Sequence, residues 1–335
     1  MSFKEANKAG QLAQLNTLAR NALAHYGMVD ARLTLLNYTN NAVYEVNGDV
    51  HAVLRVHRPE NRTQAGINAE LAWLSAIREA TDLIVPQPLA PLYEGALGDE
   101  GLQSSVVLFG WIDGQSIKPF ELTLAQARQI GRFAAHLHTF SERFTPDNGF
   151  DRPQLDWEGL FGARSPYQSD TENELFSADQ RQIMQEVAQR TQDVMQMIGK
   201  EAHNYGMIHA DLIAKNILFN GEQIAAIDFD DCGFGYYLYD LAPFLWGAHY
   251  EPVYREQRAA LWEGYTEIRP QPPAYGDYVE AFVAARHVAS CRWLAGNIHN
   301  PNIKGRAEQI IADRVEEMKH FLTTGELIMG RGMQF

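Results

Sequence analysis

Residues 209–230 read HADLIAKNILFNGEQIAAIDFD, a pattern that predicts two short strands joined by a tight turn. Asn220-Gly221 is a strong signal for a two-residue hairpin. The apolar runs that predict the strands are residues 217–219 and 223–227. Because the chain folds back at the turn, the start of the first strand and the end of the second share one edge. We therefore expect Asn216 and Asp228 to be neighbours.

Three side chains near this hairpin carry oxygen atoms that suit one chemistry. The amide of Asn216 and the carboxylate of Asp228 are ligands for a hard cation such as Mg²⁺, which takes one or two carboxylates and completes its shell with water and phosphate. Asp211 lies five residues before Asn216. From there it can accept a proton from a nucleophile, and this order of residues is typical of a kinase catalytic loop.

The pattern His209-x-Asp211-x4-Asn216, followed by Ile227-Asp228-Phe229, resembles the aminoglycoside phosphotransferase and choline kinase superfamily, and within it the homoserine kinase type II group. The resemblance implies an α+β, bilobal, protein-kinase-like fold, with a small antiparallel sheet in the first lobe and a larger, mainly helical second lobe. It also implies that Asp211 is the catalytic base, and that Asn216 and Asp228 hold Mg²⁺ against the phosphates of ATP. We expect a nucleotide-binding lobe at residues 1–112 and a catalytic and substrate-binding lobe at residues 113–335.

Composition narrows the class of protein. The chain has 335 residues, of which 46% are hydrophobic, enough for one large two-lobed domain. Its net charge of −14 argues against a nucleic acid or an anionic membrane as partner. Since ATP is also an anion, its site must be locally basic or bridged by a metal. Two cysteines give no disulfide framework, and there is no signal peptide or membrane span, so we expect a cytoplasmic protein.

The first lobe is expected to contain a helix and an antiparallel meander. The helix is predicted at residues 11–26, and the strands at residues 32–36, 42–46 and 51–56. In the family, the turn at residues 37–41 covers the nucleotide phosphates. This turn has no glycine, but its backbone amides and side chains, Thr39 and Asn40 among them, can bind phosphate. An ordinary polar hairpin explains the same residues.

The third strand carries Arg55 at the position where protein kinases place a lysine. The following helix, predicted at residues 63–78, has Glu70 on its apolar side. A carboxylate buried alone is costly, so Glu70 needs a partner, and Arg55 is the expected one. Arg55 then anchors the nucleotide phosphates, or the pair is a structural salt bridge without nucleotide contact.

Residues 106–111 predict a further strand that leads to the boundary between the lobes near Asp113. In the family, backbone groups of this hinge bind adenine, which makes Phe109, Gly110, Trp111 and Ile112 candidates. The same residues also fit simply the fifth strand of the small sheet, and the two interpretations are compatible.

The second lobe is expected to be mostly helical. Capping boxes predict two helix starts, at Thr123 with Gln126 and at Ser177 with Gln180. The predicted helices are residues 123–140, 177–200, 250–267, 275–298 and 302–322. Asp240 resembles the aspartate that braces the catalytic loop in this superfamily, although an aspartate at a helix N-terminus is also an ordinary cap. His209 fits a catalytic role, but we expect it to hold that loop through backbone hydrogen bonds.

Residues 141–170 are irregular and rich in aromatic side chains, so we expect them to recognise the acceptor substrate. Trp246 and Trp293 fit either an aromatic wall for a cation or an ordinary core.

The predicted function is an ATP-dependent transfer of the γ-phosphate to a hydroxyl of a small molecule such as an amino alcohol, amino acid, sugar or aminoglycoside. A protein Ser/Thr kinase is an alternative, but Ile213 replaces the usual lysine, and only eleven residues separate Asp228 from Asp240, which leaves little room for an activation segment. A nucleotide-binding regulatory protein without turnover is the other alternative.

Overall fold

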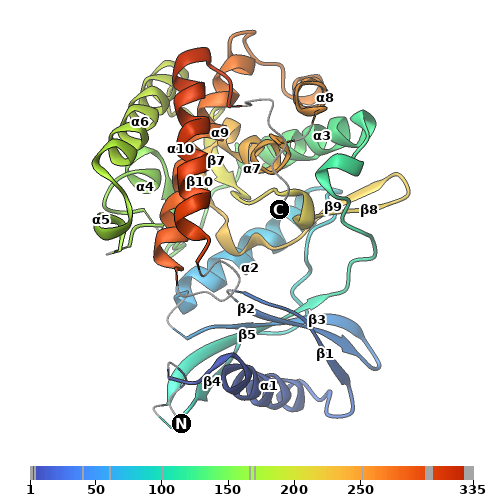
Figure 1. Cartoon of the computed structure of the whole chain (residues 1–335). Helices are drawn as coiled ribbons and strands as arrows, with labels where there is room; N and C mark the ends of the chain where they lie inside the picture. The colour runs from blue at the N-terminus through green and yellow to red at the C-terminus, as the bar shows by residue number, and fades with distance from the viewer. Residues whose placement is uncertain are drawn as a thin grey trace. The chain divides into compact units, whose positions relative to one another are not determined.

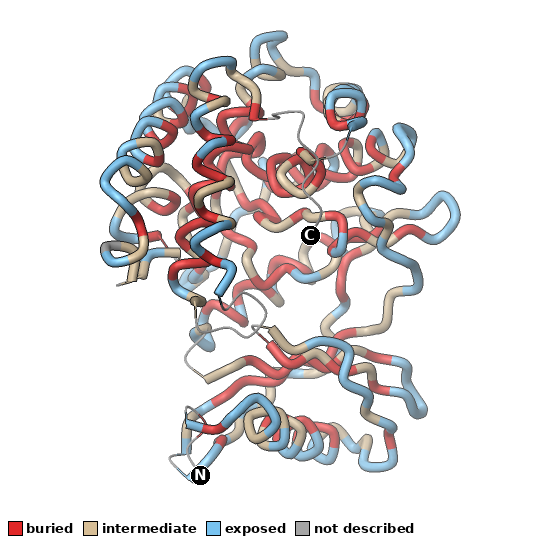
Figure 2. Tube along the Cα trace, viewed as in Figure 1, coloured by how far each residue is buried: buried red, intermediate tan, exposed pale blue. Residues whose placement is uncertain are grey.

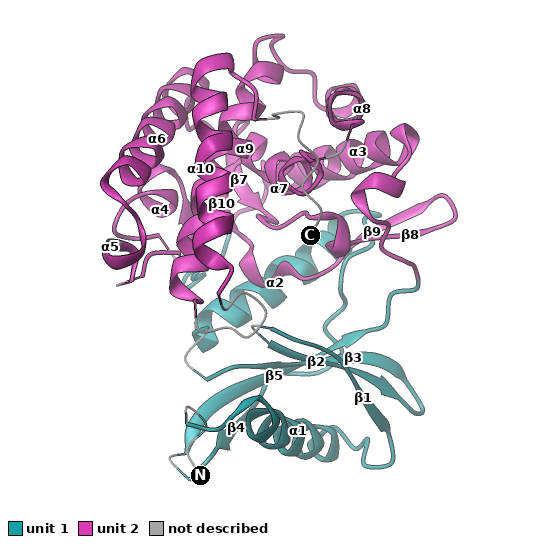
Figure 3. Cartoon of the chain, in the orientation of Figure 1, with its two compact units in different colours: residues 1–113, 146–151 teal, residues 114–145, 152–335 magenta. Residues whose placement is uncertain are grey.

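The computed structural model describes residues 3, 5–39, 41–59, 62–99, 101–165, 167–169, 171–250, 252–298 and 305–327. It divides the chain into two compact units (Figure 3). The first contains residues 1–113 and 146–151, and the second residues 114–145 and 152–335. Strands dominate the first unit and helices the second, so the predicted α+β class is confirmed.

The first unit is built on an antiparallel five-stranded sheet with the order β1-β2-β3-β5-β4 (Figure 1). The strands are β1 (Arg32–Tyr38), β2 (Asn41–Asn47), β3 (His51–His57), β4 (Tyr93–Leu97) and β5 (Leu102–Gly110). The predicted meander corresponds to β1, β2 and β3. The strand expected at residues 106–111 begins earlier, at Leu102, because its first residues pair with β4. Strand β4 was not predicted from the sequence.

The two faces of this sheet are covered by different helices (Figure 1). Helix α1 (Lys8–His25) buries Leu15 and Leu18 in a core with alternate strand residues such as Leu54 and Val56. Since successive side chains of a strand point to opposite faces, Arg55 points away from that core. Helix α2 (Gln64–Ala80), which starts after the N-cap Thr63, lies on that other face.

The second unit contains a set of helices, a three-stranded sheet and a hairpin. Its helices are α3 (Leu124–Ser141), α4 (Trp157–Leu160), α5 (Glu172–Leu175), α6 (Ala178–Ile198), α7 (Tyr237–Ala248), α8 (Tyr254–Ile268), α9 (Tyr275–Gly296) and α10 (Ala307–Thr324). Both predicted capping boxes are present, at Thr123 and Ser177. The first residues of the helix expected at 302–322 lie outside the described part of the chain.

Two glycines allow α3 and α8 to pack with their backbones close together. A Cβ on Gly131 would lie 2.0 Å from the carbonyl oxygen of Leu261, and one on Gly264 would lie 2.0 Å from that of Arg128. This packing holds His138 of α3 beside Tyr265 of α8.

Helices α7 and α9 form the interior of the second unit. Buried residues, red in Figure 2, run along both helices, and α7 is buried continuously from Tyr237 to Leu245. None of the helices that the structure describes has both the length and the apolar character needed to cross a bilayer.

The short strands of the second unit flank the stretch from which the fold was predicted. Strand β10 (Gly233–Tyr236) lies between β6 (Gln154–Leu155) and β7 (Tyr205–Ile208), and β8 (Ile217–Asn220) pairs with β9 (Gln223–Ala226). The hairpin is confirmed, but Asn220 pairs with Gln223, so the two turn residues are Gly221 and Glu222. Gly221 takes the positive φ of 60° that the turn requires.

Candidate active site

The loop between β7 and β8 is anchored by Asp240, in the first turn of α7. Its Oδ2 accepts a hydrogen bond from the backbone N–H of His209 at 2.9 Å, and its Oδ1 accepts one from Ala210 at 2.6 Å. Asp240 is completely buried. Its charge is thus used to fix two consecutive peptide groups immediately before Asp211, as the resemblance implied.

A buried histidine supports Asp240 from behind. His138 Nε2 lies 3.0 Å from Asp240 Oδ2, and its Nδ1 lies 3.0 Å from the hydroxyl of Tyr265. Burial lowers the pKa of His138 and outweighs the opposing effect of Asp240, so the ring is neutral. Neutral His138 therefore donates to Asp240 through Nε2 and accepts from Tyr265 at Nδ1.

His209 holds the loop through both ring nitrogens, as predicted. Its Nε2 lies 3.0 Å from the carbonyl oxygen of Ile227, and the backbone N–H of Asp211 donates to its Nδ1 at 3.2 Å. The ring also packs on Phe229, with the centroids 4.3 Å apart. His209 thus ties the loop to the end of the hairpin without offering a free nitrogen for chemistry.

The carboxylate of Asp211 is held by two partners. Asn216 Nδ2 donates to its Oδ2 at 3.0 Å and to its backbone carbonyl at 2.9 Å, and Arg286 Nη2 donates to its Oδ1 at 2.5 Å. The Asp211 side chain is only 13% exposed. Burial raises the pKa of Asp211 to about 6, and the nearby Asp231 adds to the shift, while Arg286 opposes it. Asp211 can therefore exchange a proton near neutral pH.

Arg286 of α9 is the site residue that sequence reasoning missed. Besides Asp211, it donates from Nη1 to the hydroxyl of Tyr167 at 3.3 Å, and its guanidinium lies 5.8 Å from the ring centre of Trp246. The signal for it was a charged residue among the apolar residues in the middle of α9, because a charge in such surroundings needs a partner. Tyr167 comes from the irregular segment that was expected to recognise the acceptor.

The predicted metal ligands lie on adjoining strand ends. The backbone N–H of Ile227 donates to the carbonyl oxygen of Asn216 at 2.9 Å. This contact brings Asp228, the residue after Ile227, to the same edge of the hairpin as Asn216. Because Asn216 Nδ2 faces Asp211, its Oδ1 is the atom left for a cation. Asp228 is exposed, and it and Ala210 are the non-glycine residues with positive φ in the described part of the chain, at 66° and 68°. Such conformations are uncommon outside glycine and cluster at functional sites.

In the first unit, Arg55 and Glu70 form the predicted ion pair. It is bidentate, with distances of 3.0 Å from Nη1 to Oε1 and 2.6 Å from Nη2 to Oε2. Both residues are buried, and the guanidinium lies 5.1 Å from the ring centre of Phe109. This bidentate ion pair connects α2 to the sheet. Arg55 and Glu70 therefore have the structural role that was one of the two alternatives left open by the sequence.

The other predicted nucleotide residues are distributed over the same unit. Thr39 Oγ1 bonds to Asn37 Oδ1 at 3.3 Å, whereas Asn40 lies outside the described residues. Phe109 is buried, and Trp111 stacks on His51 with the ring centres 4.2 Å apart. Ile112 is half-buried just after β5.

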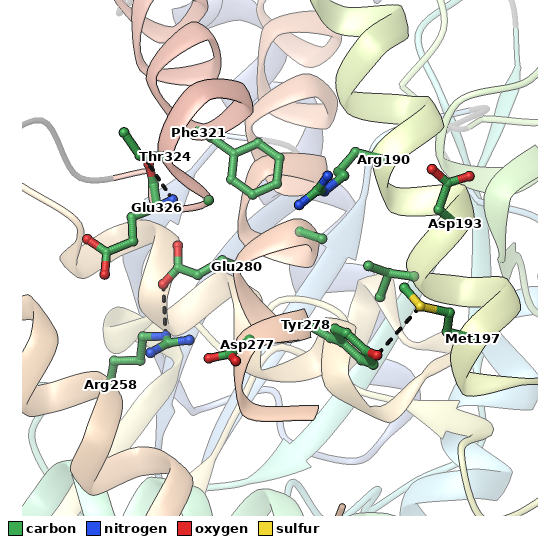
Figure 4. A pocket seen from close by; sticks show the side chains of 13 residues that line it. Arg190, Asp193, Met197, Arg258, Asp277, Tyr278, Glu280, Phe321, Thr324 and Glu326 are labelled. Carbon is green, nitrogen blue, oxygen red and sulfur yellow. Dashed lines mark hydrogen bonds and ion pairs between the residues drawn. The ribbon is translucent and has the colours of Figure 1, made fainter. Parts of the chain in front are cut away.

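A cavity of about 550 Å³ in the second unit is distinct from these residues (Figure 4). It lies among α6, α8, α9 and α10 and is lined by charged side chains, including Arg190, Arg258 and Glu280. Arg258 and Glu280 pair with each other across 2.8 Å. None of the predicted site residues lines this cavity, so it does not mark the site described above.

Comparison with known proteins agrees with the geometry. Residues 35–276 match the APH model, described as the phosphotransferase enzyme family. The chain is 24% identical over 282 residues to amicoumacin kinase of Bacillus subtilis strain 168, covering 80% of this chain and 81% of that protein.

Solved structures show the same fold. A microcompartment-associated aminopropanol kinase superposes with a TM-score of 0.81 at 30% identity, covering 93% of this chain and 98% of that chain. An amicoumacin kinase, hAmiN, solved with AMP-PNP, Ca²⁺ and Ami, superposes with a TM-score of 0.72 at 16% identity, over 89% and 90% of the two chains. The predicted resemblance and the prediction of a small-molecule kinase are confirmed. The chain belongs to the phosphotransferase enzyme family.

Proposed function

We propose that the chain transfers the γ-phosphate of ATP, in the presence of Mg²⁺, to the hydroxyl of a small amino alcohol. The observation that carries this proposal is the Asp211 carboxylate, which is only 13% exposed and is fixed by Asn216 and Arg286 on a loop anchored by Asp240. Phosphoryl transfer requires mainly alignment and charge stabilisation, and an immobilised carboxylate supplies both for the acceptor.

Asp211 is the proposed catalytic base. It accepts a hydrogen bond from the acceptor hydroxyl and takes its proton as the oxygen bonds to the γ-phosphorus and the bond to the leaving ADP oxygen breaks. With a pKa of about 6, Asp211 is mostly ionised at pH 7 and remains a competent base. His209 and Asp240 position Asp211 without contacting substrate.

Each unit carries residues that we propose bind the nucleotide. The oxygens of Asn216 and Asp228 suit Mg²⁺, which would neutralise the phosphate charge. Arg55 would anchor the phosphates with Thr39 and Asn40, and Glu70 would orient Arg55. Phe109, Trp111 and Ile112 would border the adenine. The hAmiN structure, which holds AMP-PNP and Ca²⁺, supports use of a nucleotide with a divalent ion.

The acceptor class rests on two observations. The aminopropanol kinase is 30% identical across nearly the whole chain, and its name gives an amino alcohol as its substrate. The net charge of −14 also favours a cationic acceptor over an anionic one.

An acceptor screen tests the proposal. ADP release is measured with Mg²⁺-ATP and aminopropanol, ethanolamine, homoserine, a sugar, an aminoglycoside or a peptide, and ³¹P NMR identifies the phosphate ester. We expect release with amino alcohols well above the acceptor-free rate. Release with the peptide alone would indicate the protein-kinase alternative, and no release with any acceptor would indicate a regulatory protein.

A further inference from the structure

A second cluster of chemically active side chains lies apart from the Asp211 loop. Within the described ranges, His249, His287 and Glu317 form a buried group whose candidate ligand atoms all lie within 4.8 Å of one another. His249 follows the end of α7, His287 is on α9 and Glu317 is on α10. Glu317 Oε2 lies 2.5 Å from His287 Nε2 and 3.3 Å from His249 Nε2.

The hydrogen bond of His249 to Trp246 leaves its second ring nitrogen facing the carboxylate of Glu317. Its Nδ1 faces the carbonyl oxygen of Trp246 at hydrogen-bonding distance, and a carbonyl only accepts, so Nδ1 carries the proton. In a neutral ring, Nε2 then presents a lone pair to the carboxylate of Glu317. Two acceptors face each other unless a proton or a metal ion lies between them. A histidine that donates one N–H to a carbonyl while its other nitrogen binds metal is the usual arrangement in metal sites.

The other two members complete the cluster. His287 and Glu317 are both buried, and one carboxylate oxygen of Glu317 faces the Nε2 atoms of both histidines.

We propose that His249 Nε2, His287 Nε2 and Glu317 bind a divalent transition-metal ion of the Zn²⁺ class. Two imidazoles and a carboxylate in a buried site suit Zn²⁺ rather than Mg²⁺, which keeps oxygen ligands and water. Metal–ligand bonds of about 2.0–2.1 Å at tetrahedral angles separate two ligand atoms by roughly 3.3 Å. His249 and Glu317 already have that spacing, whereas His287 Nε2 and Glu317 Oε2, now 2.5 Å apart, must separate by about 0.8 Å.

The ion would connect three helices behind the catalytic carboxylate. His287 follows Arg286 in α9, and the Trp246 ring lies against the guanidinium groups of both Arg286 and Arg314. The proposed role is therefore to fix α9 and α10 against the end of α7, so that Arg286 keeps its position at Asp211.

The experiment is a Co²⁺ titration of the full chain after removal of metal with a chelator, followed by visible absorption. We expect one equivalent to bind with the d–d bands of a nitrogen- and oxygen-ligated site, Zn²⁺ to displace it, and excess Mg²⁺ to have no effect. Metal analysis of the purified protein and a rise of Tm on adding Zn²⁺ are independent readouts. Absence of the bands in the wild-type chain would overturn the proposal and leave a proton between His249 and Glu317.

Variants locate the site. His287→Gln should weaken Co²⁺ binding by more than about 100-fold. Glu317→Asp should retain the ion with a shifted spectrum, which covers the case in which His287→Gln does not fold. His136→Gln, an exposed histidine on α3, is the matched control and should bind like wild type. Equal binding by His287→Gln and His136→Gln would contradict the assignment.

Discussion

The charge of Asp211 is subject to effects that act in opposite directions. Burial and Asp231 favour the protonated form, while Arg286 and the Asn216 amide favour the carboxylate. The balance leaves the pKa near the operating range of a general base. A carboxylate of this kind is reactive enough to accept a proton yet held too firmly to rotate away from the acceptor.

The pH profile of the reaction should report this balance. We expect kcat/KM for the acceptor to rise as pH passes through about 6, because Asp211 as the proposed base must lose its proton before it can act. Arg286→Met removes the charge that opposes the shift, so the rising limb should move to higher pH and the activity at pH 7 should fall. Arg286→Lys should shift the limb less. An unchanged limb in Arg286→Met would assign the titration to another group.

Asp240 acts on the backbone of the catalytic loop, and its replacement should affect stability as well as rate. In Asp240→Asn, the side-chain NH₂ group faces a backbone N–H or the donor nitrogen of His138, so two donors meet. The substitution also removes a buried charge that accepts hydrogen bonds. We expect the free energy of unfolding to fall by about 3 kcal/mol and kcat to fall with little change in KM. Urea unfolding and steady-state kinetics measure both. Asp193→Asn, on the exposed side of α6, is the control and should change neither.

At the scale of elements, the sequence predicted best what depends on neighbouring residues. The β8–β9 hairpin, both capping boxes and the Arg55–Glu70 pair follow from local spacing. The turn was misplaced by one residue because Asn-Gly is a signal for turn position, whereas register is fixed by strand pairing. Strand β4 was missed because Tyr93–Leu97 includes a glycine and lacks clear alternation.

Variants of the Arg55–Glu70 pair distinguish a purely structural role from a role in nucleotide binding. Arg55→Met leaves the Glu70 carboxylate buried and unpaired, which should lower the free energy of unfolding by about 3–5 kcal/mol. Adding Glu70→Gln should recover most of that loss. If Arg55 also contacts phosphate, the stable double variant should still show a raised KM for ATP. A normal KM for ATP in that variant would leave the pair a purely structural link between β3 and α2.

At the scale of the whole molecule, the sequence could not predict which residues far apart along the chain contact one another. Asp211 and Arg286 are 75 residues apart, and nothing in the local pattern of α9 indicates which carboxylate its arginine meets. The same holds for His138 and Asp240, which are 102 residues apart. Residues 146–151 belong to the first compact unit although the second surrounds them in sequence. Such pairings follow from tertiary packing, which a single sequence does not reveal.

The most direct test of Asp211 as the base is single-turnover phosphoryl transfer by Asp211→Asn with saturating Mg²⁺-ATP and the preferred amino alcohol. Asparagine keeps the hydrogen-bonding shape of the side chain but cannot take the proton, so the rate should fall by roughly 10²–10⁴-fold while the Kd for ATP stays within about twofold of wild type. Transfer at the wild-type rate by a folded, ATP-binding Asp211→Asn protein would contradict the account.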